Sequence, residues 1–593
     1  MNPKCELPDD ISPDTSAAAE ADQIERCNLS EDQLQKIIRD HEKWIVTRGE
    51  VGPKEGRRAN FNLVDLKGLD LSNLDLRKAK FELANLEQVR FYNTDLRESI
   101  FAGASLRHAN LQNASLLGPE LAGADITGAN LPDNITEFKP LQDVEEISKN
   151  ARKTFLALIL ACVYSWLTIA TTKDARLVSN STSSPLPIIG AEIPIVSFYV
   201  AAPLVLLGIY VYFHFYLQHL WKALALLPAR FQDGRPLDDQ SYPWLVTAII
   251  RRHHKFLMQR RSLMAKLEEI GAITLAWYTV PFTLIGFWLR YLPRHDWLVT
   301  GLHIGFLTFA FSMALLFYRC AERTIKGKEA KYIELKTIWR NAKVLNIVGV
   351  LLIGFIFWSI SFGAINGTPA REWKRNGDAY AFVPWIFDKL GYDIFADFRE
   401  TSVSTKPGDY WQISSESDRI RSVQGAHLKR SDLRFADMFR AFLVKANIRN
   451  SDLHGARMRE TNLQHAVLRG ANLENVDFRN ADLRGTDFRE ATLVKARFSG
   501  ADLRNTDLGL ADFREANFEN ANLEGADFRC ANIIDVKNLT IEHLIRVESL
   551  YRAKMNSGFV ERVKARKPEL FEKPPPWHDM STPYNEDKKD TCE

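Results

Sequence analysis

The sequence predicts a chain of mixed class, in which two β-solenoids flank a helical region that crosses a membrane. Three observations lead to this prediction. An apolar residue recurs at every fifth position from Ala426 to Ile533, the same register occupies Ala59 to Leu131, and long apolar runs lie between the two blocks. Neither a helix of 3.6 residues per turn nor a strand of period two keeps a period of five on one face, whereas a solenoid does.

The longer block also indicates how many repeats make one coil. A small residue lies two positions before each central Leu, Phe, Met or Ile, and Asp or Asn lies between them in most repeats. Every fourth central residue is of the same kind, as in the series Met438, Met458, Phe478, Phe498, Phe518 and the series Leu443, Leu463, Leu483, Leu503, Leu523. Because like side chains stack well, we expect a four-sided coil of about 20 residues, with coils about 4.8 Å apart.

The repeated pattern Ala–Asp/Asn–Leu–X–X resembles that of the pentapeptide-repeat family. The resemblance implies that each block folds as a right-handed quadrilateral β-helix, with the apolar and small residues inside. It extends to the preceding segment, where His41 and Trp44 match the His-x-x-Trp pattern of a helix that covers the first coil. Such a cover has a physical purpose, because an exposed β edge invites pairing with other chains.

Helices are expected at the outer end of each block. Ser30 and Gln33 form a capping box for the first helix, and Thr540 is expected to cap a helix after the longer block. The apolar face of that second helix would hold Leu544, Val547, Leu550 and Tyr551. The expected divisions are a disordered tail (1–28), a capping helix (29–58), the first β-helix (59–135), a connector (136–153), the transmembrane region (154–366), a connector (367–424), the second β-helix (425–535), a C-terminal capping helix (536–572) and a tail (573–593).

Five apolar runs without acidic residues predict transmembrane helices, since each is close to the roughly 20 residues that a helix needs to cross a bilayer. The runs are Phe155–Thr172, Ile195–Leu217, Ala272–Leu289, Val299–Tyr318 and Val344–Ile365. Buried core helices are the alternative, but five such runs favour a multi-pass protein of the cell membrane. The resemblance, to membrane-embedded bacterial pentapeptide-repeat proteins, implies a bacterial inner membrane.

The distribution of Lys and Arg predicts an orientation. Nine basic residues lie in 222–266 and eight in 319–343, against two in 173–194 and one in 291–298. By the positive-inside rule the two basic segments face the cytoplasm, together with the first solenoid. Five crossings then place the second solenoid outside, whereas a re-entrant or interfacial run would leave both solenoids in the cytoplasm.

Neither an enzyme activity nor a metal or cofactor is expected from the motifs. The sequence has no P-loop, no dinucleotide-binding glycine motif, no zinc-protease motif and no nucleophile elbow. Its six cysteines lack CxxC spacing and are expected to be structural thiols. His253 and His254 lie among arginines, whose charge disfavours a bound metal.

The fourth apolar run contains two features of possible function. Gly301 and Gly305 form a small-xxx-small pair that allows close packing of two helices, as in a homo-oligomer, although two lipid-facing glycines would look the same. His303 lies between them and is the ionisable residue in the interior of that run. An ionisable group inside a membrane suggests a proton relay.

The second solenoid offers one candidate surface for a protein partner. The residues that follow the central position in one column are Lys429, Arg449, Arg469, Arg489, Gly509 and Arg529. In a coil of four repeats they stack into what we call the basic stripe. Asp487, Asp507 and Asp527 lie on the same repeats, so a self-neutralised ladder is the alternative interpretation.

Charge argues against a role in DNA mimicry or nucleic-acid binding. Residues 425–535 hold 17 basic and 17 acidic residues, whereas imitation of DNA needs a strongly negative surface. The leading hypothesis is a multi-pass membrane protein that uses its β-helices as protein-interaction scaffolds. Its expected partners are membrane lipid and a protein of unknown identity. The alternative is a channel, transporter or membrane effector that the solenoids regulate.

Overall fold

The computed structural model describes residues 26–47, 56–135, 139–179, 184–185, 192–240, 263–325, 344–369 and 382–573. The chain forms two compact units. The first comprises Met1–Val163, Val205–Thr283 and Thr308–Val350, and the second comprises Tyr164–Leu204, Leu284–Leu307 and Leu351–Glu593. Each unit contains one solenoid together with parts of the long helices.

The N-terminal solenoid has the expected coil of four repeats. Its coils are joined by parallel bridges between residues in equivalent positions of successive coils, as between Asn60 and Lys80. Phe61, Phe81 and Phe101 stack in one buried column, with ring centroids 5.1 and 4.9 Å apart. The 3-10 turn η2 (Gly118–Leu121) replaces a regular repeat at Pro119, which lacks the backbone N–H that a ladder needs.

The first coil is covered as the sequence predicts. Helix α1 (Glu31–Val46) begins with a capping box in which Ser30 and Gln33 bond reciprocally. Ahead of it, strand β1 (Cys27–Asn28) pairs in parallel with β2 (Val64–Asp65) of the first coil. The open edge is therefore closed by both a strand and a helix.

The last coil of this solenoid is completed by a distant segment that follows α4 (Ile195–Ala225). Arg230 forms a parallel bridge with Asp125, and its carbonyl accepts a 3.1 Å hydrogen bond from the Ile126 amide. Phe231 is buried behind it. The sequence Ala229–Arg230–Phe231 has the small–polar–apolar order of a repeat, but it stands alone, and α5 (Leu237–Gln240) soon follows.

Among the described residues, five helical segments are long and apolar enough to cross a membrane. They belong to α2 (Lys139–Thr171), α4, the continuous run α6 (Leu263–Ile273), η5 (Thr274–Tyr278) and α7 (Thr279–Tyr291), α8 (Trp297–Ile325) and α10 (Val344–Asn366). The expected connector at 136–153 is not separate, because α2 runs through most of it without a break. The short elements α3 (Asp174–Ser179), β3 (Ser184–Pro185), β4 (Glu192–Ile193), η6 (Leu292–Arg294) and α12 (Phe382–Lys389) lie between or after these helices.

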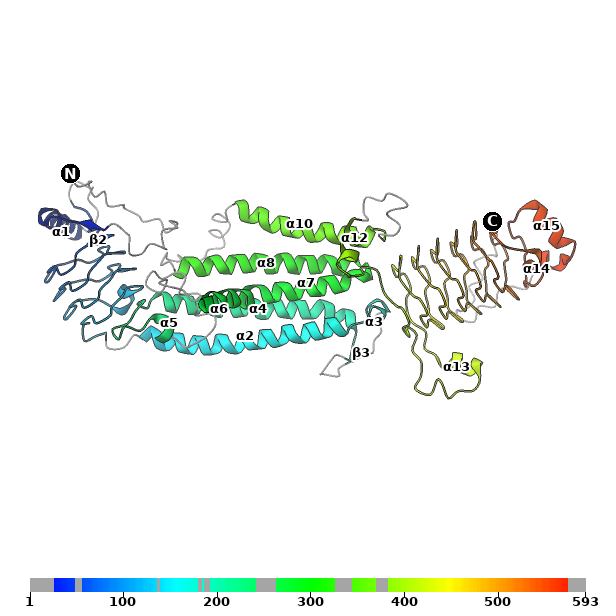
Figure 1. Cartoon of the computed structure of the whole chain (residues 1–593), viewed down its shortest axis with the longest axis horizontal. Helices are drawn as coiled ribbons and strands as arrows, with labels where there is room; N and C mark the ends of the chain where they lie inside the picture. The colour runs from blue at the N-terminus through cyan, green and yellow to red at the C-terminus, as the bar shows by residue number, and fades with distance from the viewer. Residues whose placement is uncertain are drawn as a thin grey trace. The chain divides into compact units, whose positions relative to one another are not determined.

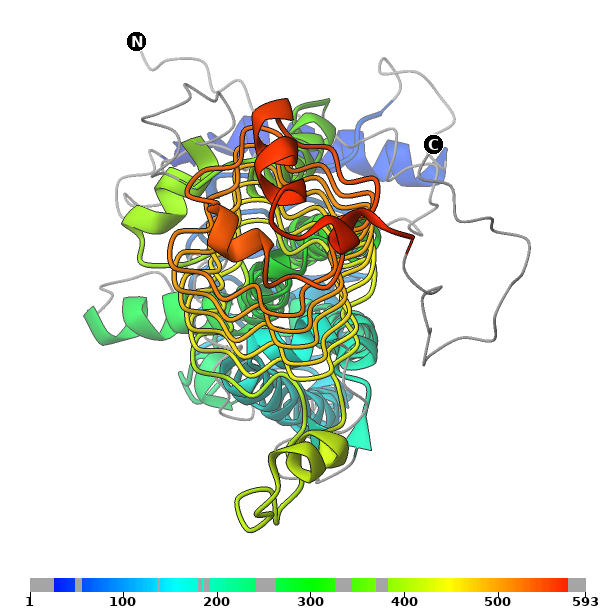
Figure 2. The same cartoon turned by 90° about the vertical axis from the view of Figure 1, so that its right-hand side faces the viewer.

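The C-terminal solenoid begins earlier than predicted, near Ala396. Asp397 and Ser402 form parallel bridges with Asp437 and Phe442, ahead of the first predicted repeat. The segment between Thr405 and Gln424, which pair with each other, is an insertion that carries α13 (Glu416–Ser422). The insertion projects from the side of the stacked coils, which superimpose when viewed along the solenoid (Figure 1, Figure 2).

The outer end of this solenoid differs from the predicted single capping helix. Thr540 caps a helix as expected, but α14 (Ile541–Leu544) has only four residues. The chain then returns to the solenoid, where Ser549 and Lys554 form bridges with Asp527 and Asn532. Helix α15 (Ser557–Lys564) and η8 (Pro568–Phe571) cover the final coil (Figure 1). Val547 and Leu550 are therefore core residues of the solenoid and not the face of a helix.

Candidate functional site

The residues of the basic stripe lie on one face of the C-terminal solenoid. Parallel β-bridges join equivalent residues of successive coils into a ladder, which begins with His427 and Asn447 and continues to Asp527. Each residue of the basic stripe lies two positions after a residue of this ladder. The column arrangement deduced from the sequence is therefore correct. Docking of a partner on this face stays a prediction.

The arginines at one end of the stripe are engaged in ion pairs. Arg489 lies between Asp487 and Asp507, at 2.8 and 3.1 Å, and its side chain is only 12% exposed. Arg529 pairs with Asp527 at 2.5 Å and is 10% exposed. These charges stabilise the ladder and offer little to a partner.

The other end of the stripe is more accessible. Lys429 is exposed, and Arg469 pairs with Glu490 while keeping a third of its side chain in solvent. Arg449 lies between them and is half-buried. A partner that approaches this face would therefore meet Lys429 and Arg469 before it met any of the buried arginines.

Asp507 differs from the other aspartates of this ladder because no arginine follows it on its own repeat. Asp487 and Asp527 each have an arginine two residues later, whereas Gly509 occupies that place after Asp507. Burial, with the neighbouring carboxylates of Asp487 and Asp527 adding to it, raises the pKa of Asp507 to about 7, although Arg489 opposes the shift.

The C-terminal solenoid is attached to helix ends of its own unit by a buried polar junction. Asp174, at the start of α3, accepts a hydrogen bond from Arg290 of α7 and another, of 2.8 Å, from the Asp397 amide in the first coil. Arg290 also donates to the Thr172 carbonyl at 3.1 Å. One carboxylate thus joins a helix, a turn and the solenoid.

A second contact lies one coil further along. Asp432 pairs with Arg434 at 2.7 Å and faces His295, from the turn between α7 and α8, at 3.4 Å. Arg434 in turn donates to the carbonyl of Ile365, near the end of α10, at 2.9 Å. Burial raises the pKa of Asp432, but hydrogen bonds from His295 and Arg434 outweigh it and hold that pKa below its ordinary value.

The predicted intramembrane residues lie in different surroundings. His303 is buried, and its Nε2 lies 2.8 Å from the carbonyl oxygen of Tyr199. Gly301 and Gly305 are exposed, and a Cβ built on either would meet nothing within 4 Å. The glycine pair therefore lies on an open face of α8, where lipid or a second copy would be accommodated equally well.

A buried aromatic cluster around His214 was missed from the sequence. The His214 ring stacks on Phe317 at 4.6 Å and lies 5.3 Å from Trp277, and among the described residues neither of its nitrogens has a hydrogen-bond partner. Trp277 belongs to the π-helical turn η5, and its carbonyl accepts from Tyr210 at 3.0 Å. Such turns often occur at functional sites, but an unbroken apolar run hides them from sequence patterns.

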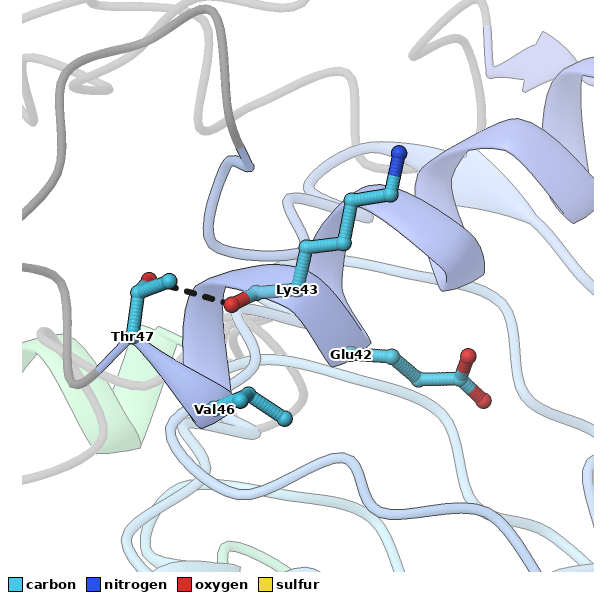
Figure 3. Close-up of a pocket in the computed structure, with 4 residues that line it drawn as sticks. All are labelled: Glu42, Lys43, Val46 and Thr47. Atoms are coloured by element: carbon cyan, nitrogen blue, oxygen red, sulfur yellow. Dashed lines mark hydrogen bonds between the residues drawn. The ribbon is translucent and has the colours of Figure 1, made fainter.

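Few other features suggest a ligand. A shallow depression of about 320 Å³ at the end of α1 is lined by Glu42, Lys43, Val46 and Thr47, and it is open and mostly apolar (Figure 3). Within the described residues, no group of three or more His, Cys, Asp or Glu is arranged to hold a metal. His253 and His254 lie outside the described residues.

The cysteines differ in part from the expected structural thiols. Cys27 and Cys530 are each disulfide-bonded, so the prediction of a thiol is wrong at these two positions. Cys162 and Cys320 are free thiols, as expected, and Cys162 is buried. Spacing in the sequence could not have distinguished the two groups, because pairing depends on which segments the fold brings together.

Comparison with known sequences identifies both solenoids. The profile described as pentapeptide repeats matches eight copies, over residues 59–97, 99–133, 423–455, 456–493 and 493–529. No curated protein sequence matches the chain.

Solved structures of pentapeptide-repeat proteins match parts of the chain. Rfr23 from the cyanobacterium Cyanothece 51142 is 23% identical over 19% of this chain and 64% of its own, less than two thirds of it, with a TM-score of 0.13. The protein alr5209 from Nostoc Pcc 7120 is 26% identical over 18% and 84%, with a TM-score of 0.15. AT2G44920 from the Arabidopsis thaliana thylakoid lumen is 23% identical over 27% and 82%, with a TM-score of 0.12. Both solenoids are therefore pentapeptide-repeat domains.

Proposed function

We propose that this chain is a multi-pass membrane protein whose two solenoids, as right-handed quadrilateral β-helices, are protein-interaction scaffolds on opposite sides of the membrane. The five helices of membrane length in the described part of the chain support the crossing, and five crossings would separate the two solenoids. Acyl chains of the membrane would cover the exposed apolar side chains of α10, such as Leu351 and Phe355.

The contacts of each solenoid carry the proposed orientation. The C-terminal solenoid contacts Asp174 and His295, which belong to the two segments poor in Lys and Arg. The N-terminal solenoid pairs with Arg230, which belongs to the segment that holds nine basic residues. Under the positive-inside rule these contacts favour a cytoplasmic N-terminal solenoid and a C-terminal solenoid on the outer side.

Thiol labelling in intact cells tests the orientation. Glu42 and Glu524 are exposed residues of the N-terminal cap and the C-terminal solenoid, and each is replaced by Cys in a parent whose six native cysteines are replaced by Ser. An impermeant maleimide should label Glu524→Cys at once and Glu42→Cys only after permeabilisation, and the parent gives the background. Protection of both thiols would place both solenoids in the cytoplasm and overturn the split arrangement.

The scaffold role is tested on the accessible end of the basic stripe. Lys429→Glu with Arg469→Glu reverses one exposed charge and one that is a third exposed, at the cost of the pair between Arg469 and Glu490, whereas reversing Arg489 would break two ion pairs in the ladder. Full-length chains are purified from their own membranes, and proteins bound to the wild type are compared with those bound to this variant. Arg459→Glu with Lys495→Glu is the charge-matched control on exposed positions outside the stripe. Loss of a partner only from the stripe variant supports the proposal, and equal recovery from both variants removes the stripe from it.

A second candidate function is conduction of an ion or solute, controlled by the solenoids. The π-helical turn η5 beside the buried ring of His214 favours it, because polar groups without partners are costly to keep in a membrane interior. Flux through reconstituted vesicles should then fall when His214 or His303 is replaced by Leu. Absence of flux for every ion and solute tried would exclude this function.

A further inference from the structure

Three aromatic side chains surround the ammonium of Lys406 at the base of the insertion. The Lys406 Nζ lies 4.1 Å from the ring centroid of Phe442, 4.9 Å from that of Trp411 and 5.5 Å from that of Tyr410. The rings form steep walls, since Tyr410 is inclined at 86° to Trp411 and at 81° to Phe442. Ring faces within about 6 Å of a cation attract it through their quadrupoles, and three of them form an aromatic cage.

The solenoid holds the walls of this cage in place. Phe442 is a ladder residue, bridged to Ser402 on one side and Asn462 on the other. Thr405 and Gln424 exchange backbone hydrogen bonds of 2.9 and 3.1 Å, which close the insertion next to Lys406. Tyr410 and Phe442 are buried against each other, whereas Trp411 is 76% exposed, so the cage has a rigid floor and one solvent-facing wall.

The chain's own occupant fits this cage poorly. A primary ammonium carries three N–H donors. Among the described residues no carboxylate, carbonyl or hydroxyl accepts a hydrogen bond from the Lys406 Nζ, and burial lowers the pKa of this side chain. Lys406 is only partly buried, so its N–H donors reach water, but the rings that surround the ammonium take up part of its hydration without accepting those hydrogen bonds. A quaternary ammonium has the same charge and no N–H, so it gains the attraction of the rings without losing such hydrogen bonds.

We propose that Tyr410, Trp411 and Phe442 form a binding site for a quaternary ammonium group, which Lys406 occupies until such a ligand displaces it. The ligand class includes choline, glycine betaine and the headgroup of phosphatidylcholine, which share the trimethylammonium group. Lys406 competes for the same ring faces, so its removal strengthens binding by the inverse of the fraction of molecules in which the cage is empty; the gain is tenfold if Lys406 fills about nine tenths of the cages.

Equilibrium dialysis of radiolabelled choline against the full-length chain, in a detergent without choline headgroups, tests this proposal. Lys406→Ala should bind choline about tenfold more tightly than the wild type, because the competing cation is gone. Lys445→Ala is the matched control, since Lys445 is an exposed lysine that donates to the Arg421 carbonyl of the same insertion. It should bind choline as the wild type does.

The walls of the cage are tested in the Lys406→Ala chain. Adding Trp411→Leu should weaken choline binding at least about tenfold, and the exposure of Trp411 makes loss of folding an improbable cause. The neutral analogue 3,3-dimethylbutanol has the shape of choline without its charge and should compete poorly. Absence of choline binding to Lys406→Ala, equal competition by the neutral analogue, or no effect of Trp411→Leu would each overturn the proposal.

The source of the ligand is distinguished by the reactivity of Lys406 in the wild type. Displacement from the cage should make its amine more reactive toward an acylating reagent, as measured by mass spectrometry of the peptide. Higher reactivity in nanodiscs of phosphatidylcholine than in nanodiscs of phosphatidylethanolamine identifies the lipid headgroup. Higher reactivity only after free choline or glycine betaine is added identifies a soluble ligand. Unchanged reactivity under all of these conditions contradicts displacement.

Discussion

His41 Nδ1 accepts a 3.0 Å hydrogen bond from the backbone amide of Ala59, the first small residue of the first repeat. The His41 ring is completely buried, and Trp44 stacks on it at 5.6 Å with the two planes only 12° apart. This contact explains the His-x-x-Trp pattern. The equivalent amide in later repeats bonds to a carbonyl three residues earlier, as Ala79 does to Leu76, and His41 supplies the acceptor for Ala59, which no repeat precedes; the tryptophan covers the histidine.

The N-terminal cap should weaken in mild acid. Burial lowers the pKa of His41 from 6.5 to about 4, and protonation of Nδ1 would also break its bond to Ala59. Between these two pKa values the unfolded state binds a proton that the folded state does not. The stabilisation that the neutral His41 ring gives to the folded cap is therefore complete above pH 6.5. As the pH falls toward 4, the free energy of unfolding falls by up to about 3 kcal/mol.

Hydrogen exchange of residues 59–66, corrected for the intrinsic effect of pH, measures this loss. Protection in the wild type should fall between pH 7.5 and 5, with the values chosen to bracket the ordinary histidine pKa of about 6.5. His41→Phe should lower protection at pH 7.5, because the Ala59 amide is left unsatisfied, and should remove the pH dependence. A pH dependence that persists in His41→Phe would assign the effect to another group.

Strict periodicity made most of this fold predictable from sequence. The alternation of Phe and Leu columns gave the coil length, because a coil of four repeats places like side chains such as Phe498 and Phe518 in stacking contact. The five apolar runs gave the helices for a similar reason, since only their length and composition had to be recognised. Each of these patterns repeats a local rule many times.

Features that occur only once were not predictable. Ala396–Asp397–Phe398 and Ala229–Arg230–Phe231 both extend a solenoid, but each is a single repeat cut off by an insertion or by a helix. The aromatic cluster of His214 and the junction at Asp174 depend on which helices pack together. Long-range packing leaves no period in the sequence, so pattern analysis cannot find it.

Replacement of Asp507 by Asn should stabilise the C-terminal solenoid in alkaline conditions. The folded-state pKa of about 7 exceeds the ordinary 3.8, so the folded state holds a proton that the unfolded state has lost. This contribution is complete below pH 3.8 and disappears as the pH rises through 7. At pH 8 the substitution Asp507→Asn should therefore raise the free energy of unfolding by on the order of 1 kcal/mol, after allowance for the exposed quarter of the side chain.

Asp502→Asn is the matched control for this prediction, and its effect should have the opposite sign. Burial raises the pKa of Asp502, but hydrogen bonds from Arg504 hold it below its ordinary value, so its contribution is present above pH 3.8. Hydrogen exchange across residues 483–532 at pH 8 should show more protection in Asp507→Asn and less in Asp502→Asn. Equal changes in both variants would contradict the assigned shifts.

Asp174→Ala should loosen the first coil of the C-terminal solenoid. The substitution leaves Arg290 without the partner of its buried charge and removes the acceptor of the Asp397 amide. Loss of one partner from a buried ion pair costs about 3–5 kcal/mol. Exchange of amides 396–403 should therefore accelerate while that of residues 500–530 does not change. Asp409→Asn, an exposed acidic residue of the insertion, is the control and should change neither region.

Phe498→Ala should destabilise the C-terminal solenoid through loss of packing alone. Phe498 is fully buried and stacks between Phe478 and Phe518, at centroid distances of 5.3 and 4.9 Å. Removing such a ring leaves a cavity between two coils that backbone ladders hold apart, and the expected loss is about 3–5 kcal/mol. Because a solenoid is stabilised mainly by contacts between neighbouring coils, hydrogen exchange should accelerate most from residue 478 to residue 518.

The control Arg459→Ala changes an exposed side chain of the same solenoid and should have little effect on exchange. Acceleration spread equally over the whole solenoid would instead show that its coils unfold as one cooperative block.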